Sequence, residues 1–297
     1  MLLVGSTNHL EDLDREYTIA EDTSVTAIAA GQLPGGPVYV LLDSERVARV
    51  GDFELTEVSE LPSATGQSMA AAGSKLIVGT EGAHLLEVDP GTGQVTALES
   101  FDRVPGREAW ENPAASEPDL CSIAVGGDGS LFVNVHVGGL WRSTDAGATW
   151  QNVIEPAQDV HEVATGAGGR VVVAAARGAA WSDDSGRTWR WTAEGMHAGY
   201  ARAVAVDGGV AYVTSSTGPT TTDGRIYRWS AGGALEQCRT GLPDSFPYNL
   251  DSGCVAARSG EVVLGTRDGR LYRSRDGGES WEQVAERMHP ITSVRFV

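Results

Sequence analysis

Short apolar segments alternate along the chain with turns rich in glycine, serine and aspartate. One unit of this pattern contains four expected strands, at residues 120–125, 131–135, 139–143 and 151–154. Units of the same form begin at Val160, Ala203 and Cys254, and simpler copies begin at Val25 and Met69. Short strands at regular spacing with turn residues between them predict an all-β array of four-stranded units.

Three segments share the pattern S-x-D-x-G-x-[TS]-W, beginning at Ser143, Ser182 and Ser274. Self-similarity at a spacing of tens of residues is typical of propellers and solenoids. Aspartate accepts hydrogen bonds from nearby backbone N–H groups, glycine permits a positive φ, and tryptophan offers a ring that neighbouring sheets can bury. We therefore predict structural hairpin turns at Ser143, Asp145, Gly147, Trp150, Ser182, Asp184, Gly186, Trp189, Ser274, Asp276, Gly278 and Trp281.

The two ends of the chain complete the repeat. Residues 291–297 are interpreted as a first strand without its own blade, and residues 2–19 as the three strands that it lacks. Joined, they form a seventh blade and remove the exposed strand edge of an open array. The prediction is a seven-bladed β-propeller of four-stranded blades, forming a single domain over residues 1–297.

Composition narrows the classes of function. The chain has 40 acidic and 22 basic residues, and its net charge of -18 disfavours nucleic acid or anionic membranes as partners. We expect a monomer. Three cysteines without a C-x-x-C pair predict neither a disulfide framework nor a metal pair. No basic leader with an apolar core and no membrane-length apolar run is visible, so we expect a cytoplasmic protein, or a secreted one if a leader was trimmed.

The three motifs and their blade period resemble the Asp-box, or BNR-repeat, propellers of the sialidase-like superfamily. More narrowly, residues 135–143 and 159–163 look like bacterial stand-alone BNR-repeat proteins that are labelled glycosyl-hydrolase-like. The resemblance implies that the Asp boxes lie on the turn between the third and fourth strands, on the face opposite the ligand site. A sialidase would also show an Arg-Ile-Pro motif, and this sequence contains none.

That resemblance selects the candidate binding residues. The ligand face is made by connections between second and third strands and by those between blades. The former supply His9, Glu81, His136, Arg177, Arg267 and Asp268. The latter supply Asp119, Asp159, His161, Glu162, Tyr200, Arg202, Tyr248, Asn249 and Asp251.

Histidines beside acidic residues suggest a general acid, a metal ligand or a strand-end hydrogen bond. His136 precedes Asp159 and His161 by 23 and 25 residues, so these side chains come from adjacent blades and can meet at the channel mouth. No short-range ligand pair is present, so neither a metal nor another cofactor is expected. Asp159, Glu162, Asp251 and Asp268 are the carboxylates available for glycoside hydrolysis, or they are polar strand ends with no catalytic role.

Two connections, residues 102–119 and 214–224, exceed ordinary hairpin lengths and fall on the same expected face. Trp110 on the first can stack on a sugar or peptide, or pack over the neighbouring blade. The leading hypothesis is a noncatalytic propeller that binds an unknown glycan, peptide or protein. The alternative is a xyloglucanase-like or sialidase-like glycoside hydrolase, so enzymatic activity is left open. A third class, an assembly factor, predicts a patch of arginines or aromatics rather than a deep pocket.

Overall fold

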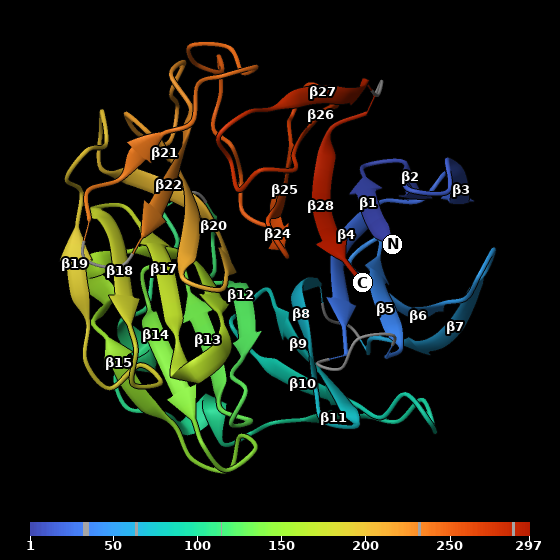
Figure 1. The fold of residues 1–297 in the computed structure, drawn as a ribbon. Helices are drawn as coiled ribbons and strands as arrows, with labels where there is room; N and C mark the ends of the chain where they lie inside the picture. The colour runs from blue at the N-terminus through green and yellow to red at the C-terminus, as the bar shows by residue number, and fades with distance from the viewer. Residues whose placement is uncertain (32–35, 63–64, 114, 231–232, 287–288) are drawn as a thin grey trace.

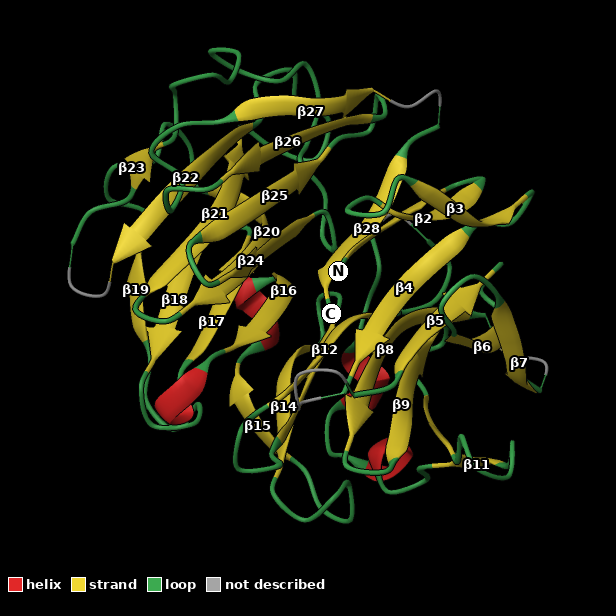
Figure 2. Cartoon of the chain, turned by 45° about the vertical axis from the view of Figure 1, so that its right-hand side comes forward, coloured by secondary structure: helices red, strands yellow, loops and turns green. Residues whose placement is uncertain are grey.

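The computed structural model describes residues 1–31, 36–62, 65–113, 115–230, 233–286 and 289–297. Within these ranges the chain forms seven antiparallel sheets of four strands each. The sheets are arranged radially as the blades of a propeller, and the N- and C-termini lie side by side (Figures 1 and 2). The predicted all-β seven-bladed propeller is confirmed.

Each blade uses its strands in the same order. The innermost strands are β4 (Val25–Ala30), β8 (Gly66–Ala72), β12 (Leu120–Val125), β16 (Val160–Thr165), β20 (Tyr200–Asp207), β24 (Val255–Arg258) and β28 (Ile291–Phe296). The second strands are β5 (Val38–Leu42), β9 (Lys75–Thr80), β13 (Leu131–Val135), β17 (Val171–Ala175), β21 (Val210–Ser216), β25 (Glu261–Gly265) and β1 (Leu2–Ser6).

The outer half of each blade is shorter and more polar. The third strands are β6 (Arg46–Val50), β10 (Leu85–Val88), β14 (Gly139–Ser143), β18 (Gly178–Ser182), β22 (Arg225–Ser230), β26 (Arg270–Ser274) and β2 (His9–Asp12). The fourth strands are β7 (Leu55–Glu60), β11 (Val95–Ala97), β15 (Gln151–Ile154), β19 (Arg190–Thr192), β23 (Glu236–Gln237), β27 (Glu282–Glu286) and β3 (Tyr17–Glu21).

Side-chain patterns explain this layering. The second strand β17 has the sequence VVVAA and is buried along its whole length, because neighbouring blades cover both of its faces. The innermost strand β12 alternates between buried and half-buried residues, and its half-buried Ile123 and Val125 pack against the core layer shared with the preceding blade. The core consists of sheet-on-sheet layers. In one of them Phe132 of the β12–β15 blade packs with Val163 and Val171 of the next blade.

The ring is closed by its first and last strands. β28 pairs antiparallel with β1, with Leu2 opposite Phe296 and Val4 opposite Val294. The backbone N–H of Val297 donates to the carbonyl of Met1 at 3.0 Å. The expected closure of residues 291–297 onto residues 2–19 is therefore confirmed, and it leaves no unpaired strand edge at the seam.

The three S-x-D-x-G-x-[TS]-W segments form hairpin turns of one geometry. In the first turn the Ser143 hydroxyl donates to Asp145 Oδ1 at 2.8 Å and accepts the Gly147 N–H at 2.8 Å. The Thr149 N–H and hydroxyl donate to the two oxygens of Asp145 at 2.8 and 2.6 Å. Equivalent bonds form in the turns around Asp184 and Asp276.

These turns connect third strands to fourth strands, at β14–β15, β18–β19 and β26–β27. Because consecutive strands are antiparallel, the turns lie at the opposite end of the blade from connections between second and third strands. The structural turns and the candidate residues on these connections therefore lie at opposite ends of the blades, as predicted. The helices of the described residues are single 3₁₀ turns, and none is long or apolar enough to cross a membrane.

Candidate functional site

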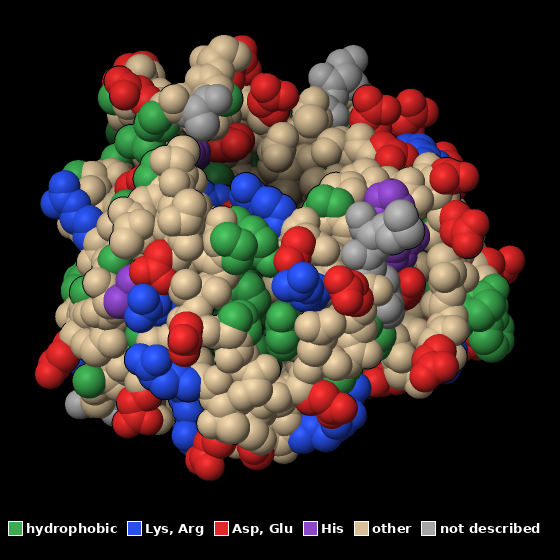
Figure 3. All heavy atoms as spheres, turned by 90° about the horizontal axis from the view of Figure 1, so that it is seen from above, with side chains coloured by type: hydrophobic (Ala, Val, Ile, Leu, Met, Phe, Trp, Pro, Cys, Tyr) green, Lys and Arg blue, Asp and Glu red, His purple; other side chains and the backbone are tan. Residues whose placement is uncertain are grey.

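The candidate residues gather at the end of the propeller where the innermost strands begin. Asp119 and Asp159 stand immediately before β12 and β16, Tyr200 begins β20, and His136 follows β13. Neighbouring innermost strands adjoin one another around the ring, so these positions meet near the axis. Figure 3 shows one face of the molecule hollowed near its middle, with basic and acidic side chains at the edge of the hollow.

Asp119, His136, Asp159 and His161 form one group, called here the His–Asp cluster. His136 lies between two carboxylates, with its Nδ1 3.7 Å from Asp119 Oδ1 and its Nε2 3.7 Å from Asp159 Oδ1. His161 Nε2 lies 3.5 Å from Asp159 Oδ2. The expected approach of His136 to Asp159 and His161 from the adjacent blade is therefore observed.

Irregular backbone places these side chains. β-bulges interrupt the registers of β12 and β16 near their starts, at Cys121 and His161, and add a residue that turns a side chain toward the mouth. Asp159 has a φ of 49°, and Val137, which follows His136, has a φ of 47°. Left-handed backbone is rare for a β-branched residue and is concentrated at functional sites.

The tautomer of His161 is set by the main chain. Its Nδ1 lies 2.6 Å from the carbonyl oxygen of Ala201, which only accepts, so Nδ1 carries a proton. The ring is 5% exposed and packs against Tyr200, with centroids 4.7 Å apart. In the neutral ring, Nε2 therefore presents a lone pair toward Asp159.

Burial and charge act in opposite directions on the protonation of the cluster. Burial lowers the pKa of His136 below its usual value, although Asp159 and Asp119 oppose this shift. Burial alone would raise the pKa of Asp159, but the adjacent His161 and His136 hold it below its ordinary range. Burial and Asp119 raise the pKa of the Cys121 thiol, which donates to Asp119 Oδ1 at 3.5 Å. Cys121 is therefore a thiol at neutral pH.

An arginine bridge adjoins the cluster. Arg202 donates to Asp251 Oδ1 at 3.0 Å, and Arg267 donates to Asp251 Oδ2 at 2.8 Å. The three side chains come from the β20–β23 and β24–β27 blades and the connection between them. Asp251 is thus occupied on both oxygens by neighbouring cations.

Glu162 is held by the backbone of the next two blades. Its Oε2 accepts the Val204 N–H at 2.8 Å, and its Oε1 accepts the Gly253 N–H at 2.9 Å. Burial raises the pKa of Glu162 to about 7, against the lowering effect of these bonds and of Arg295 and Arg202. Both carboxyl oxygens therefore face main chain.

The remaining candidates lie outside the cluster. Asp268 accepts the Thr266 hydroxyl at 2.6 Å and pairs with Arg270 at 3.1 Å. Arg177 is exposed on the β17–β18 connection, and His9 pairs with Glu11 in the closing blade.

Trp110 is 7% exposed and packs on Phe101 and Trp141, with ring centroids 5.6 and 5.7 Å away. Its ring belongs to the core between blades. Of the two readings of Trp110, the structure favours packing over stacking on a ligand.

The same face carries a cavity of about 420 Å³, called here the acidic pocket. The acidic and histidine side chains in its lining are Glu81, His84, Asp102 and Glu117. His84 Nδ1 lies 2.8 Å from Asp102 Oδ1. Sequence reasoning selected Glu81 and the loop 102–119, but it missed His84. The only signal for His84 was its place in the same connection as Glu81.

Arg107 fixes the loop beside the pocket. It donates to the carbonyls of Ala83 and Gly82 at 2.8 and 2.7 Å, and its guanidinium lies 4.9 Å from the Trp110 ring centroid. The loop is therefore tied to the β9–β10 connection through the main chain. An isolated bridge between Glu81 and Asp119 joins the pocket to the His–Asp cluster.

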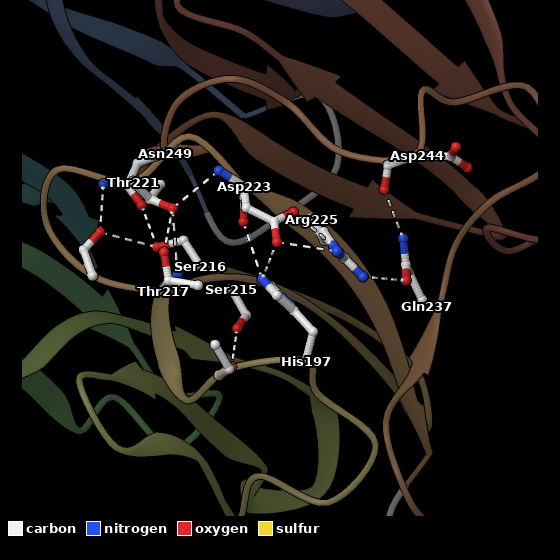
Figure 4. Close-up of polar contacts among 12 residues, drawn as sticks. His197, Ser215, Ser216, Thr217, Thr221, Asp223, Arg225, Gln237, Asp244 and Asn249 are labelled. Atoms are coloured by element: carbon white, nitrogen blue, oxygen red, sulfur yellow. Dashed lines mark hydrogen bonds and ion pairs between the residues drawn. The ribbon is translucent and has the colours of Figure 1, made fainter.

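The second long connection is also internally bonded (Figure 4). Asn249 accepts the Ser216 hydroxyl at 2.5 Å and donates to the carbonyls of Gly218 and Pro219 at 3.3 and 2.9 Å. Arg225 donates two bonds to Asp223, at 2.9 and 3.0 Å, and His197 lies 3.5 Å from the same carboxylate. Asn249 therefore supports the loop by bonding its backbone.

No protein-family model matches the sequence, and no curated protein matches it. Similar solved structures include the GH74 xyloglucanase of Xanthomonas campestris, 20% identical with a TM-score of 0.61 over 95% of this chain and 46% of that chain. YCF48 bound to D1 peptide is 15% identical with a TM-score of 0.59 over 96% of this chain and 85% of that chain.

The WD40 propeller domain of Doa1 is 14% identical with a TM-score of 0.64, over 96% of this chain and 86% of that chain. The present chain spans about half the length of the xyloglucanase, 46%. The neighbours thus include both glycoside hydrolases and other propellers, and at these identities they share the fold alone.

Proposed function

We propose that the chain is a noncatalytic binding propeller that takes a basic segment of a peptide or protein on the face opposite the three structural turns. The observation that carries the proposal is the acidic pocket. Its volume, about 420 Å³, falls within the range of ligand sites. The described residues that line it include three carboxylates and no lysine.

Charge supports a cationic ligand group. Arg107 lies 3.6 Å from Asp102, and two of its nitrogens donate to backbone carbonyls. Three carboxyl groups in the lining against this one guanidinium beside it make the pocket acidic. A lysine or arginine side chain complements this charge, and the overall charge of -18 would speed the approach of a basic partner.

Three of the four carboxylates considered for hydrolysis, all except Asp159, are already committed to other contacts. Asp251 is bound by two arginines, Glu162 by two backbone N–H groups, and Asp268 by Thr266 and Arg270. A glycoside hydrolase needs a protonated acid and a second carboxylate that both face the substrate. These contacts give the xyloglucanase-like and sialidase-like alternative no support.

The three structural turns also suggest a family for the chain. We infer that the chain is a member of the Asp-box propellers of the sialidase-like superfamily. Support comes from three turns that repeat one set of Ser, Asp, Gly and Thr or Ser hydrogen bonds at the same place in their blades. YCF48, a propeller with which the chain shares its fold, has been solved with a bound peptide, so this fold is suited to peptide binding.

Fluorescence anisotropy with a labelled arginine-rich peptide tests the function, in buffer that contains a chelator. We expect saturable binding that weakens with salt, and at least a tenfold loss in the double variant Glu81→Gln/Glu117→Gln. Glu279→Gln is the matched control, because Glu279 is exposed on the opposite face. Equal affinity of the double variant and the wild type, or preferential binding of a neutral xyloglucan oligosaccharide, would refute the proposal.

A further inference from the structure

We propose that His136, Asp159 and His161 form a binding site for a first-row divalent transition-metal ion such as Zn²⁺. The site goes beyond the binding function and stands without it, because the acidic pocket supplies none of the three ligands. The absence of a short-range ligand pair in the sequence led to the opposite expectation.

The donor set selects the class of ion. Two imidazoles and one carboxylate suit zinc, cobalt or iron(II), whereas calcium and magnesium prefer oxygen ligands alone. The ligand atoms of His136, Asp159 and His161 all lie within 4.8 Å of one another. A single ion can therefore be reached by all three side chains.

The separations match shared coordination better than direct hydrogen bonding. The two nitrogen–oxygen distances, 3.7 Å from His136 and 3.5 Å from His161, exceed the usual hydrogen-bond length. Ligand atoms placed tetrahedrally at about 2.0–2.1 Å from one ion lie about 3.4 Å apart.

Buried polar atoms without partners point to the same place. Among the described residues, His161 Nε2 and Asp159 Oδ1 are buried and make no hydrogen bond. Because the Ala201 carbonyl takes the Nδ1 proton of His161, the neutral ring sets a lone pair against a carboxylate that also only accepts. A buried acceptor without a partner is destabilising, and a cation between the two groups satisfies both.

The surroundings favour a cation and orient the ligands. Asp119 Oδ1 lies 3.7 Å from Nδ1 of His136, and its negative charge favours a proton on Nδ1, which leaves Nε2 to ligate. Two aspartates serve the cluster, whereas the nearby Arg202 is paired with Asp251. The local charge around the three ligands is negative.

Three protein ligands leave the ion with at least one open position. Structural zinc sites are closed by four protein ligands, whereas open sites hold water or a ligand in the remaining place. The Cys121 thiol lies close to Asp119 and His136 and is not part of the set formed by His136, Asp159 and His161. The site is therefore of the open type, with nitrogen and oxygen ligands.

Metal titration of the full chain tests the inference. The protein, without a polyhistidine tag and stripped by a chelator, is titrated with Zn²⁺ by calorimetry and with Co²⁺ by visible absorption. We expect one ion per chain, without the near-ultraviolet band of a thiolate ligand. His136→Ala and Asp159→Asn should each weaken Zn²⁺ binding about tenfold to a hundredfold or more.

Matched variants separate this site from others. His84→Ala removes a histidine that pairs with Asp102 on the same face but is not one of the three proposed ligands. The Zn²⁺ affinity of this variant should equal that of the wild type. Cys121→Ser should also leave binding unchanged. His136→Gln replaces the imidazole by a polar side chain of similar size, so it removes the ligand with less disturbance of packing than alanine. Circular dichroism checks that each variant is folded.

Sub-stoichiometric binding, wild-type affinity in both His136→Ala and Asp159→Asn, or a loss confined to Cys121→Ser would overturn the assignment. None of these results depends on peptide binding, which is measured with the chelator present. The metal site and the proposed function can therefore fail independently.

Discussion

A carboxyl group in this propeller takes its properties from the donors that face it. Asp276 lies in an exposed turn and accepts the Ser280 hydroxyl and backbone N–H groups, which lower its pKa to about 2. Glu162 also accepts two backbone N–H bonds, but burial outweighs them and raises its pKa to about 7. Two carboxyl groups with similar backbone hydrogen bonds therefore have pKa values shifted in opposite directions, and only their burial explains the difference.

The turn carboxylate gives a pH-dependent prediction. Because the folded pKa of Asp276 lies below its unfolded value of 3.8, its contribution to stability is full above about pH 4 and is lost as the pH falls toward 2. We expect Asp276→Asn to melt below the wild type at pH 7 and the difference to shrink between about pH 4 and pH 2. Thermal melts across this range measure it. A difference independent of pH would contradict the assignment.

Glu162 gives a prediction about stability. We expect Glu162→Gln to lower the free energy of unfolding by about 1–3 kcal/mol. Both oxygens of Glu162 accept backbone N–H bonds, whereas the glutamine amide has one oxygen and one N–H₂ group, so one backbone donor would lose its acceptor. Urea denaturation measures the change. Glu57→Gln, at an exposed position of β7, is the control and should stay within about 0.5 kcal/mol of the wild type.

At the scale of an element, the connection from β11 to β12 is part of the core as well as part of the pocket. Phe101 and Trp110 anchor it between the blades, and Arg107 ties it to the β9–β10 connection. A long connection is expected to lie on the surface, but these aromatic side chains make it a packed layer. The acidic pocket is therefore bounded by a braced segment.

This gives a test of Trp110 as a core residue. We expect Trp110→Ala to cost about 3–5 kcal/mol of unfolding free energy, because it removes a buried indole. Trp191→Ala, at a ring that is 38% exposed, should cost much less. Chemical denaturation compares the two variants. Similar, small losses in both would show that Trp110 does not support the core.

At the scale of the whole molecule, stability depends on closure. β28 supplies the innermost strand of a blade whose other three strands come from the N-terminus. Its Ile291 and Val294 are buried with Leu2 and Val4. Removing the strand would expose both this apolar layer and the edge of β1.

A chain that ends at residue 290 should therefore aggregate or lose cooperative unfolding. A circular permutant that joins Val297 to Met1 by a short linker and opens near residue 195 should keep the fold, because the two termini are already hydrogen bonded. Circular dichroism melts and size-exclusion chromatography distinguish the outcomes. A stable, monomeric truncated chain would contradict the importance of closure.

Sequence reasoning predicted the architecture closely and the site only in outline. The blade pattern, the turns at Asp145, Asp184 and Asp276 and the terminal closure follow from short segments that carry their own period and turn chemistry. The approach of His136 to Asp159 and His161 was also predictable, because the strand ends of adjacent blades meet. The fixed tautomer of His161 and the bulges that place it were not, since they depend on register between strands.

The sequence by itself determined the repeat, the strands, the structural turns and the closure, because each is encoded by residues near one another or by periodic recurrence. Only the tertiary structure decided which side chains meet across blades: Asp251 with two arginines, Glu162 with the main chain of two neighbours, and Trp110 with the core. Those partners lie tens of residues apart. Their encounter depends on the curvature of the ring and on bulge positions, which no local pattern records.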